Sequence, residues 1–299
     1  MRVFVTGASG FIGSAVVAEL LGAGHEVLGL ARSDASAQAV AALGAAVQRG
    51  SLEDLESLRA GAAASDGVIH LAYIHDFSQM AAAAQADLHA IEALGAALEG
   101  TDRPLVVAAG VLGLAQGRVA SEEDAPDPAL HPRVAGVQAA LALAGRGVRS
   151  SAMRFAPTVH GEGDHGFLAY LIGVARQRGV SGYIAQGSSR WPAVHRLDAA
   201  RLVRLALEHA PAGSSWHAVA EEGVQTRTIA EAIGRHLRLP VVSVPAEAAD
   251  EHFGFLARFL AADSPVSSAL TRERLSWHPV QPGLIADLDA GHYFRLPPA

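Results

Sequence analysis

The sequence contains neither cysteine nor lysine, so all 23 of its basic residues are arginine. Without cysteine there is no disulfide, no thiolate nucleophile and no cysteine zinc site. Without lysine there is no Schiff base, no lysine general base and no lysine to hold a phosphate. Any acid, base or phosphate contact must therefore come from other side chains or from the backbone.

Basic charge and long apolar runs are scarce as well. The formal net charge is −7 and the arginines are scattered, which does not predict nucleic-acid binding. Each longer apolar stretch is broken by glycine or charge, so we expect neither a signal sequence nor a membrane span. The 14 histidines show no metal-ligand spacing, so we expect no metal. Half of the 299 residues are hydrophobic, which is enough for a large core. Because we expect no signal sequence and no membrane span, we predict a cytoplasmic protein.

What the sequence does contain is a glycine-rich turn near its start. The apolar run 3–5 ends at Thr6, and glycine recurs at Gly7, Gly10 and Gly13 ahead of a helical pattern. Glycine permits a sharp turn and a close backbone approach to a ligand, and the free N–H groups of the helix start suit a diphosphate. An ordinary strand-to-helix turn is the alternative. We predict a dinucleotide site that includes Gly7, Ser9, Gly10, Phe11, Ile12 and Gly13.

Two more motifs follow this turn: Gly-His-Glu-Val at 24–27, leading into a second strand, and His-Leu-Ala at 70–72, after a later one. With them the sequence resembles the extended short-chain dehydrogenase/reductases, which include NAD(P)-dependent epimerases and dehydratases. The resemblance implies a doubly wound parallel α/β sheet, the Rossmann fold, and a smaller C-terminal lobe that binds a small-molecule substrate. The expected Rossmann domain covers 1–155 and receives about 191–220, and the smaller lobe covers 156–190 and 221–299.

The end of the second predicted strand bears on cofactor choice. NAD-preferring folds of this kind carry an acidic residue there, whereas this chain has Ala31 followed by Arg32 and Ser33. An arginine can bind a ribose phosphate, so we predict NADP(H). A surface arginine and a helix-capping serine are the alternative. The resemblance implies further cofactor contacts at Ser51, which replaces an aspartate of the family, and at Leu52, Leu71, Ala72, Tyr73, Ala108, Pro157 and Val159.

The catalytic residues of the family are absent. The resemblance places its serine at Ala109 and its Tyr-x-x-x-Lys pair at Arg133 and Val137, and the four tyrosines all lie off that helix. We predict an atypical NADP(H)-dependent oxidoreductase that acts on a small hydrophobic carbonyl or imine compound. Two alternatives stay open: a catalytically silent NADP(H)-binding sensor or scaffold, and an isomerase that uses histidine acid/base chemistry in the same cleft.

Four side chains near predicted strand ends are candidates for the missing proton donor. Tyr73 leads, because the family places this position beside the nicotinamide. His75 and Asp76 share its loop, where a polar loop cap is the competing interpretation. His160 stands where the family usually has tyrosine, and we interpret it first as a packing residue and second as a proton donor.

Two alanine-rich helices are expected at 77–98 and 132–144. Related enzymes form dimers through the corresponding helices, so the resemblance implies a homodimer; burial within the monomer is the alternative. The acidic, proline-rich segment 121–132 is interpreted as a surface loop ahead of the second helix.

Some local predictions concern the C-terminal half. Asp198 is expected to be the N-cap of a helix, and His195 to tie the two lobes together at a strand end. Thr228 is expected to cap a later helix. Tyr183 and Trp191 are candidate pocket walls.

Overall fold

The fold is organised around a parallel sheet of seven strands. The computed structural model describes residues 1–74, 79–127 and 132–295, and the strand order is β10-β6-β5-β4-β1-β2-β3. The order reverses between β1 and β4, which opens a crevice for a ligand at the carboxyl ends of the strands. The predicted doubly wound α/β sheet is therefore confirmed. Its strands are β1 (Arg2–Thr6), β2 (Glu26–Ala31), β3 (Ala46–Arg49), β4 (Gly67–His70), β5 (Pro104–Gly110), β6 (Arg149–Phe155) and β10 (Ser214–Ala218).

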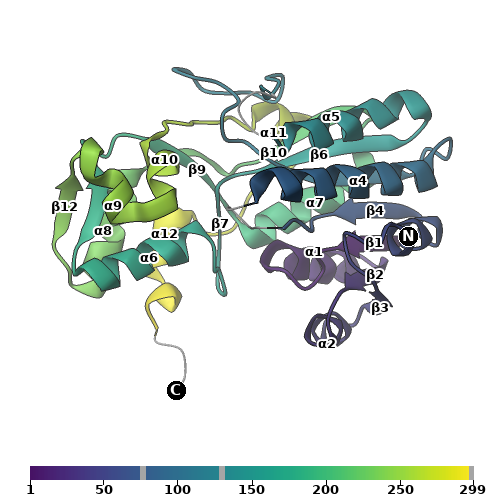
Figure 1. The fold of residues 1–299 in the computed structure, drawn as a ribbon, viewed down its shortest axis with the longest axis horizontal. Coiled ribbons are helices and arrows are strands. Elements are labelled where there is room, and N and C mark those ends of the chain that lie inside the picture. Colours follow the sequence, from purple (N-terminus) through teal and green to yellow (C-terminus); the bar gives the residue numbers. More distant parts are fainter. Residues whose placement is uncertain (75–78, 128–131, 296–299) are drawn as a thin grey trace.

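Helices cover both faces of this sheet (Figure 1). Successive side chains of a strand point to opposite faces, so Val3 and Val5 enter one core while Phe4 enters the other. The first core lies under α1 (Phe11–Gly22), α2 (Asp34–Ala42) and α7 (Arg196–His209). The second lies under α3 (Leu55–Ala63), α4 (Met80–Leu98) and α5 (Val134–Ala142), which the 3-10 turn η1 (Leu143–Arg146) extends.

A smaller lobe stands beside the carboxyl ends of the strands, on the left of Figure 1. It contains a three-stranded sheet in the order β11-β9-β7 and a two-stranded parallel sheet of β12 and β8. Helices and strands of the lobe together form a separate hydrophobic core. Its elements are β7 (Thr158–His160), α6 (Phe167–Arg178), β8 (Ser181–Ile184), β9 (Arg190–His195), β11 (Glu221–Gln225), α8 (Thr226–Leu237), β12 (Val241–Val244), η2 (Ala246–Ala248), α9 (Ala249–Phe253), η3 (Gly254–Leu256), α10 (Ala257–Ala261), α12 (Leu284–Asp289) and η4 (His292–Phe294). The short helix α11 (Ala269–Arg274) packs near β10.

β9 connects the small lobe to the large sheet: Trp191 and Ala193 pack in the core of the small lobe, and Val194 packs in a core of the large sheet. β9 pairs within the three-stranded sheet of the small lobe, and α7, which packs against the large sheet, starts at Arg196. His195 ends β9 as expected, but it also caps α7, because its Nδ1 accepts the N–H of Leu197 at 3.2 Å. Asp198 is therefore not the N-cap. Its buried carboxylate accepts the N–H groups of Val280 and Gln281, at 3.0 and 2.9 Å, and so holds the C-terminal segment.

Three other predicted helix starts also differ from the structure. α8 begins at Thr226, and its N-cap, Gln225, makes no side-chain capping bond, so Thr228 lies inside the first turn. α4 begins at Met80 rather than 77, and residues 77 and 78 lie outside the described parts of the chain. α5 begins at Val134, after Arg133 as its N-cap. Helical periodicity indicates which face of a helix is buried but does not determine its first residue, so the predicted starts differ by two or three residues.

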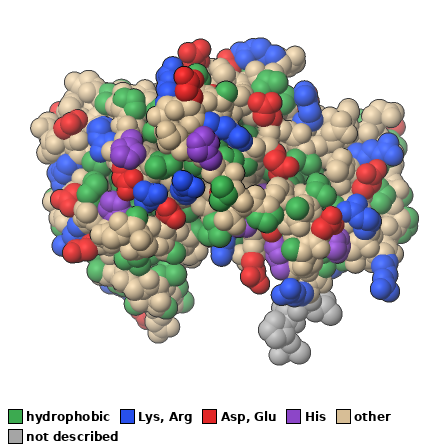
Figure 2. Space-filling model, turned by 180° about the vertical axis from the view of Figure 1, so that it is seen from behind, with side chains coloured by type: hydrophobic (Ala, Val, Ile, Leu, Met, Phe, Trp, Pro, Cys, Tyr) green, Lys and Arg blue, Asp and Glu red, His purple; other side chains and the backbone are tan. Residues whose placement is uncertain are grey.

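Acidic and arginine side chains are intermingled on the face opposite to that of Figure 1 (Figure 2). Within the described residues, no helix has both the length and the apolar character needed to cross a membrane. The same residues bring no three His, Asp or Glu side chains together around a point where a metal ion could bind.

Candidate functional site

The glycine turn joins β1 to α1 as predicted. Gly7 has a φ of +70°, which favours glycine, and Gly10 is the N-cap of α1 with no side-chain capping bond. A Cβ on Gly13 would lie 1.9 Å from the carbonyl oxygen of Gly7, so glycine is needed for α1 to pack this closely. The first N–H groups of α1 can therefore serve a ligand, and the positive end of the helix suits a diphosphate.

A cleft of about 930 Å³ extends from this turn along the carboxyl ends of the strands to the small lobe. Its volume is in the range of ligand-binding sites. Every predicted cofactor residue except Ser33 lines it: Gly7, Ser9, Gly10, Phe11, Ile12, Gly13, Arg32, Ser51, Leu52, Leu71, Ala72, Tyr73, Ala108, Pro157 and Val159. The residues present therefore fit a dinucleotide that lies along the strand ends.

Arg32 and Ser33 differ in their placement. Arg32 is exposed at the edge of the cleft, directly after β2. The hydroxyl of Ser33 accepts the N–H of Ser36 at 3.2 Å and caps α2, so this side chain is engaged in the helix instead of lining the cleft. For Ser33 the alternative interpretation, a helix cap, is the correct one. Arg49 braces the same turn through the carbonyl of Ser33 at 2.7 Å.

The positions at which the resemblance places the catalytic serine, tyrosine and lysine hold an apolar cluster and an arginine. Ala109 and Val137 pack with Ala152. The guanidinium of Arg133 lies 4.0 Å from the centre of the Tyr73 ring and donates to the carbonyl oxygen of Ala108 at 2.9 Å. It also faces the carboxylate of Asp87, at 3.3 Å. A stacked Arg133–Tyr73 pair therefore lies in the cleft.

Burial raises the pKa of Tyr73 above its ordinary value, although the nearby Arg133 cation opposes the shift. The phenol therefore stays protonated across the neutral range. The two other candidates of this loop, His75 and Asp76, lie outside the described residues.

His160 is not placed to donate a proton in the cleft. It is fully buried, its Nδ1 lies 2.8 Å from the carboxylate of Asp287, and its ring packs edge-on against His195. Thr158 and Val159 of the same strand line the cleft, but His160 does not. The packing interpretation of His160 is correct, and the proton-donor interpretation is contradicted.

The small lobe contributes cleft residues that the sequence did not reveal. Tyr183 and Trp191 are not among the residues that line the cleft, and Trp191 is fully buried with its indole N–H donated to the carbonyl oxygen of Phe259. The apolar wall comes instead from Phe167, Tyr170, Phe255 and Phe259, and Asp164 lies beside it. The available signal was the glycine-rich segment 161–166, which follows a strand end.

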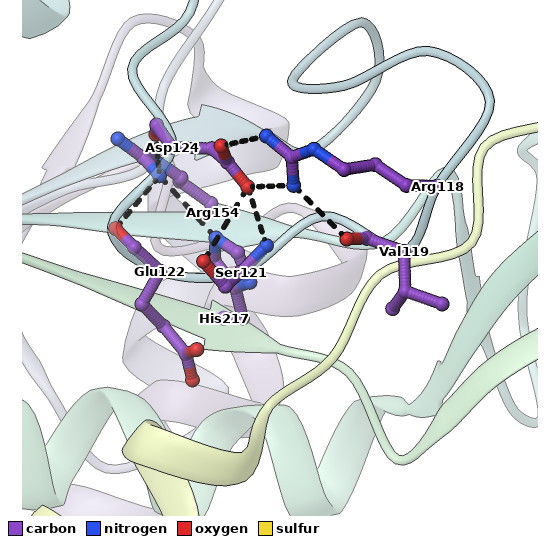
Figure 3. A network of polar contacts seen from close by, with 7 residues as sticks. All are labelled: Arg118, Val119, Ser121, Glu122, Asp124, Arg154 and His217. Carbon is purple, nitrogen blue, oxygen red and sulfur yellow. Dashed lines mark hydrogen bonds and ion pairs between the residues drawn. The ribbon is translucent and has the colours of Figure 1, made fainter.

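Arg154 was also missed. It lies at the end of β6, lines the cleft and is only 3% exposed. Figure 3 shows its guanidinium reaching the segment after β5, where it donates to the carbonyl oxygens of Glu122 at 3.4 Å and Asp124 at 2.9 Å. The Glu122 carboxylate accepts the hydroxyl of Thr271 at 2.6 Å. The beginning of the predicted surface loop is therefore anchored in the protein interior.

Comparisons with known proteins agree with this geometry. The sequence profile of the NAD dependent epimerase/dehydratase family matches residues 3–219. The chain belongs to this family. It is 50% identical to an uncharacterized protein of Schizosaccharomyces pombe, over 98% of this chain and 100% of the relative, and 44% identical to one of Saccharomyces cerevisiae, over 98% and 99%.

Solved structures confirm the extended short-chain fold of this epimerase/dehydratase-family protein. The UDP-glucose 4-epimerase of Thermotoga maritima superposes with a TM-score of 0.78 at 19% identity, covering 98% of each chain. The dTDP-glucose 4,6-dehydratase DesIV of Streptomyces venezuelae has the same TM-score and identity, covering 98% of this chain and 96% of its own. The profile match ends before β11, so it does not cover the C-terminal part of the small lobe.

Proposed function

We propose that this family member is an NADP(H)-dependent oxidoreductase that reduces a small hydrophobic carbonyl or imine compound. The observation that supports it is the Arg133–Tyr73 pair, a protonated phenol in the cleft beside the family's catalytic positions. When bound, the cofactor supplies a hydride. The glycine turn and the start of α1 bind its diphosphate, Arg32 binds its ribose phosphate, and Tyr73 gives a proton to the carbonyl oxygen.

The aromatic side chains that the small lobe contributes to the cleft support a small apolar substrate. They are Phe167, Tyr170, Phe255 and Phe259, which form an aromatic wall. A UDP-sugar, as seen with the Thermotoga epimerase, brings a second diphosphate that this wall does not match.

A panel assay tests the proposal directly. The protein is mixed with NADPH and with ketones, imines and activated alkenes, and loss of NADPH absorbance is followed. Turnover of a member of the panel supports the reductase. NADPH binding without any turnover supports the second candidate, a silent NADP(H)-binding sensor or scaffold, which the apolar filling of the triad positions favours. For the isomerase alternative, His160 lies outside the cleft lining, whereas His165 is part of it.

The preference for NADP(H) can be tested at Arg32. We expect Arg32→Ala to weaken NADP(H) binding by about 1.5–3 kcal/mol, the scale of a charge-assisted hydrogen bond, and to leave NAD(H) binding almost unchanged. Calorimetric titration with both cofactors measures this. Arg59→Ala is the control, because Arg59 lies on α3 outside the cleft lining. Equal losses for NADP(H) and NAD(H) contradict the assignment.

We also propose that the protein is a homodimer through α4 and α5. More than half of their exposed residues are alanine, which permits close helix packing. The exposed residues are Ala81, Ala82, Gln85, His89, Glu92, Ala96, Ala135, Gln138 and Ala142. We expect a dimeric mass by light scattering at micromolar concentration and a monomeric mass for Ala96→Glu. Ala39→Glu, an exposed change on α2, is the matched control and should remain dimeric. A monomeric mass for the unaltered protein rules the dimer out.

A further inference from the structure

Arg154 is the most buried of the arginines that line the described cleft, and the network of Figure 3 uses only part of its hydrogen-bonding capacity. We propose that Arg154 binds the oxygen of the substrate's reacting carbonyl and stabilises the negative charge that develops there. The proposal rests on the reductase function proposed above. It assigns to Arg154 the contact with the substrate oxygen that the family's serine and tyrosine hydroxyls would make.

The position of Arg154 is the first argument. In the sheet, Arg154 of β6 is the register partner of Ala109 of β5, the place of the family's serine. Paired residues of neighbouring strands point to the same face, so the Arg154 side chain lies on the face that carries Ala109 and Val137. All three residues line the cleft. The guanidinium therefore lies near the positions where two hydroxyl donors are absent.

The second argument is its hydrogen bonds. All three contacts are made by one terminal nitrogen, Nη1: to the carbonyl oxygens of Glu122 and Asp124, and to Nε2 of His217 at 3.3 Å. A guanidinium has five N–H groups. In the described structure Nε and Nη2 have no hydrogen-bond partner, and neither is among the side-chain atoms that are sealed from solvent without one. In Figure 3 the dashed lines of Arg154 converge on a single nitrogen.

The third argument is charge. Nη1 meets two neutral carbonyls and a histidine, and no carboxylate of the described residues forms an ion pair with this guanidinium. Asp124, an acid of the network, pairs with Arg118 instead. Burial lowers the pKa of Arg154, although Asp124 and Glu122 oppose the shift. A buried cation without a contacting anion attracts one strongly, because little water is present to solvate it.

In this proposal Arg154 stabilises the charge and Tyr73 supplies the proton. As the carbonyl carbon accepts hydride, the π electron pair of the C=O bond moves to oxygen. Arg154 stabilises this oxyanion through Nε–H or Nη2–H but does not release its proton, because a guanidinium stays charged. Tyr73 then supplies the proton that completes the hydroxyl group and regains one from water.

Benzoate tests the subsite without any turnover, because it presents a negative oxygen on a small apolar ring. Benzyl alcohol is the neutral comparison. Both are titrated calorimetrically into the full chain with excess NADP⁺, which occupies the diphosphate site. We expect Arg154→Met to weaken benzoate binding about tenfold to hundredfold and to leave benzyl alcohol binding unchanged. Arg118→Met, which removes an arginine of the same network outside the cleft lining, should leave both unchanged.

Arg154→Lys serves if the Met variant does not fold, since its single ammonium group can hold the loop carbonyls. We expect the folded Lys variant to bind benzoate about tenfold more weakly and, with an active ketone, to lose about 10²–10³-fold in kcat with little change in KM. Wild-type benzoate affinity in a folded Arg154 variant, or an equal loss in Arg118→Met, overturns the proposal. If no ketone is turned over, the reductase fails while the benzoate result still decides the subsite.

Discussion

Replacing Tyr73 by phenylalanine should lower kcat for a ketone by about 10²–10⁴-fold, the usual contribution of general acid catalysis. The ring and its stacking on Arg133, at 4.0 Å, remain in the variant, so only the hydroxyl group is removed. NADP(H) affinity should stay the same. Steady-state kinetics with a ketone from the panel, together with cofactor titration, measure both quantities.

An iminium substrate is the internal control for this change. It is already cationic and needs no proton on nitrogen before hydride arrives, so Tyr73→Phe should leave its reduction nearly unaffected. Unchanged ketone turnover would make Tyr73 a wall of the cleft and move the search to His75. The pH profile gives an independent check. The active form of Tyr73 is the protonated phenol and burial raises its pKa, so the rate should not fall on the alkaline side until pH exceeds the ordinary tyrosine value of 10.0.

Trp277→Ala should lower the free energy of unfolding by about 3–5 kcal/mol, the typical cost of truncating a buried tryptophan. Trp277 is fully buried in the core shared with α7, and its indole N–H donates to the carbonyl oxygen of Asp198 at 3.0 Å. The variant leaves both a cavity and an unpaired carbonyl oxygen next to the Asp198 contacts that hold the C-terminal segment. Urea unfolding monitored by circular dichroism measures the loss.

Val280→Ala is the matched comparison, because Val280 lies in the same segment but is 70% exposed. Its change in unfolding free energy should stay within about 0.5 kcal/mol. A Trp277→Ala loss of that same small size would show that the segment contributes little to the core.

The fold was predictable because its signals are local. Apolar runs at 3–5 and 27–30 indicate buried strands when a turn and helical periodicity follow them. The helix caps were less predictable. Aspartate is a preferred N-cap residue, but the N-cap of α7 is His195. Asp198 is buried and binds a segment about 80 residues later in the sequence, and no local pattern predicts such a contact.

The site was predictable where it depends on the backbone and unpredictable where it depends on side-chain direction. The glycine turn and the strand ends line the cleft as their positions imply. For His160 the deciding features are its full burial and its contact with Asp287, which lies 127 residues away in the sequence. Arg154 reads in sequence as one arginine among 23; its significance comes from its register with Ala109 and from its burial.

The position of β10 has a consequence for how the protein is made. β6 pairs with β5 on one side and with β10 on the other. α7 packs beside α1 on the same face of the sheet. On the ribosome, residues 1–155 emerge first and can assemble six strands, but β6 then presents an open edge until residue 218 has been synthesised. Exposed strand edges pair with other chains, so the nascent protein should depend on chaperone protection during this interval. A fragment that ends at 155 would keep that edge permanently and should aggregate.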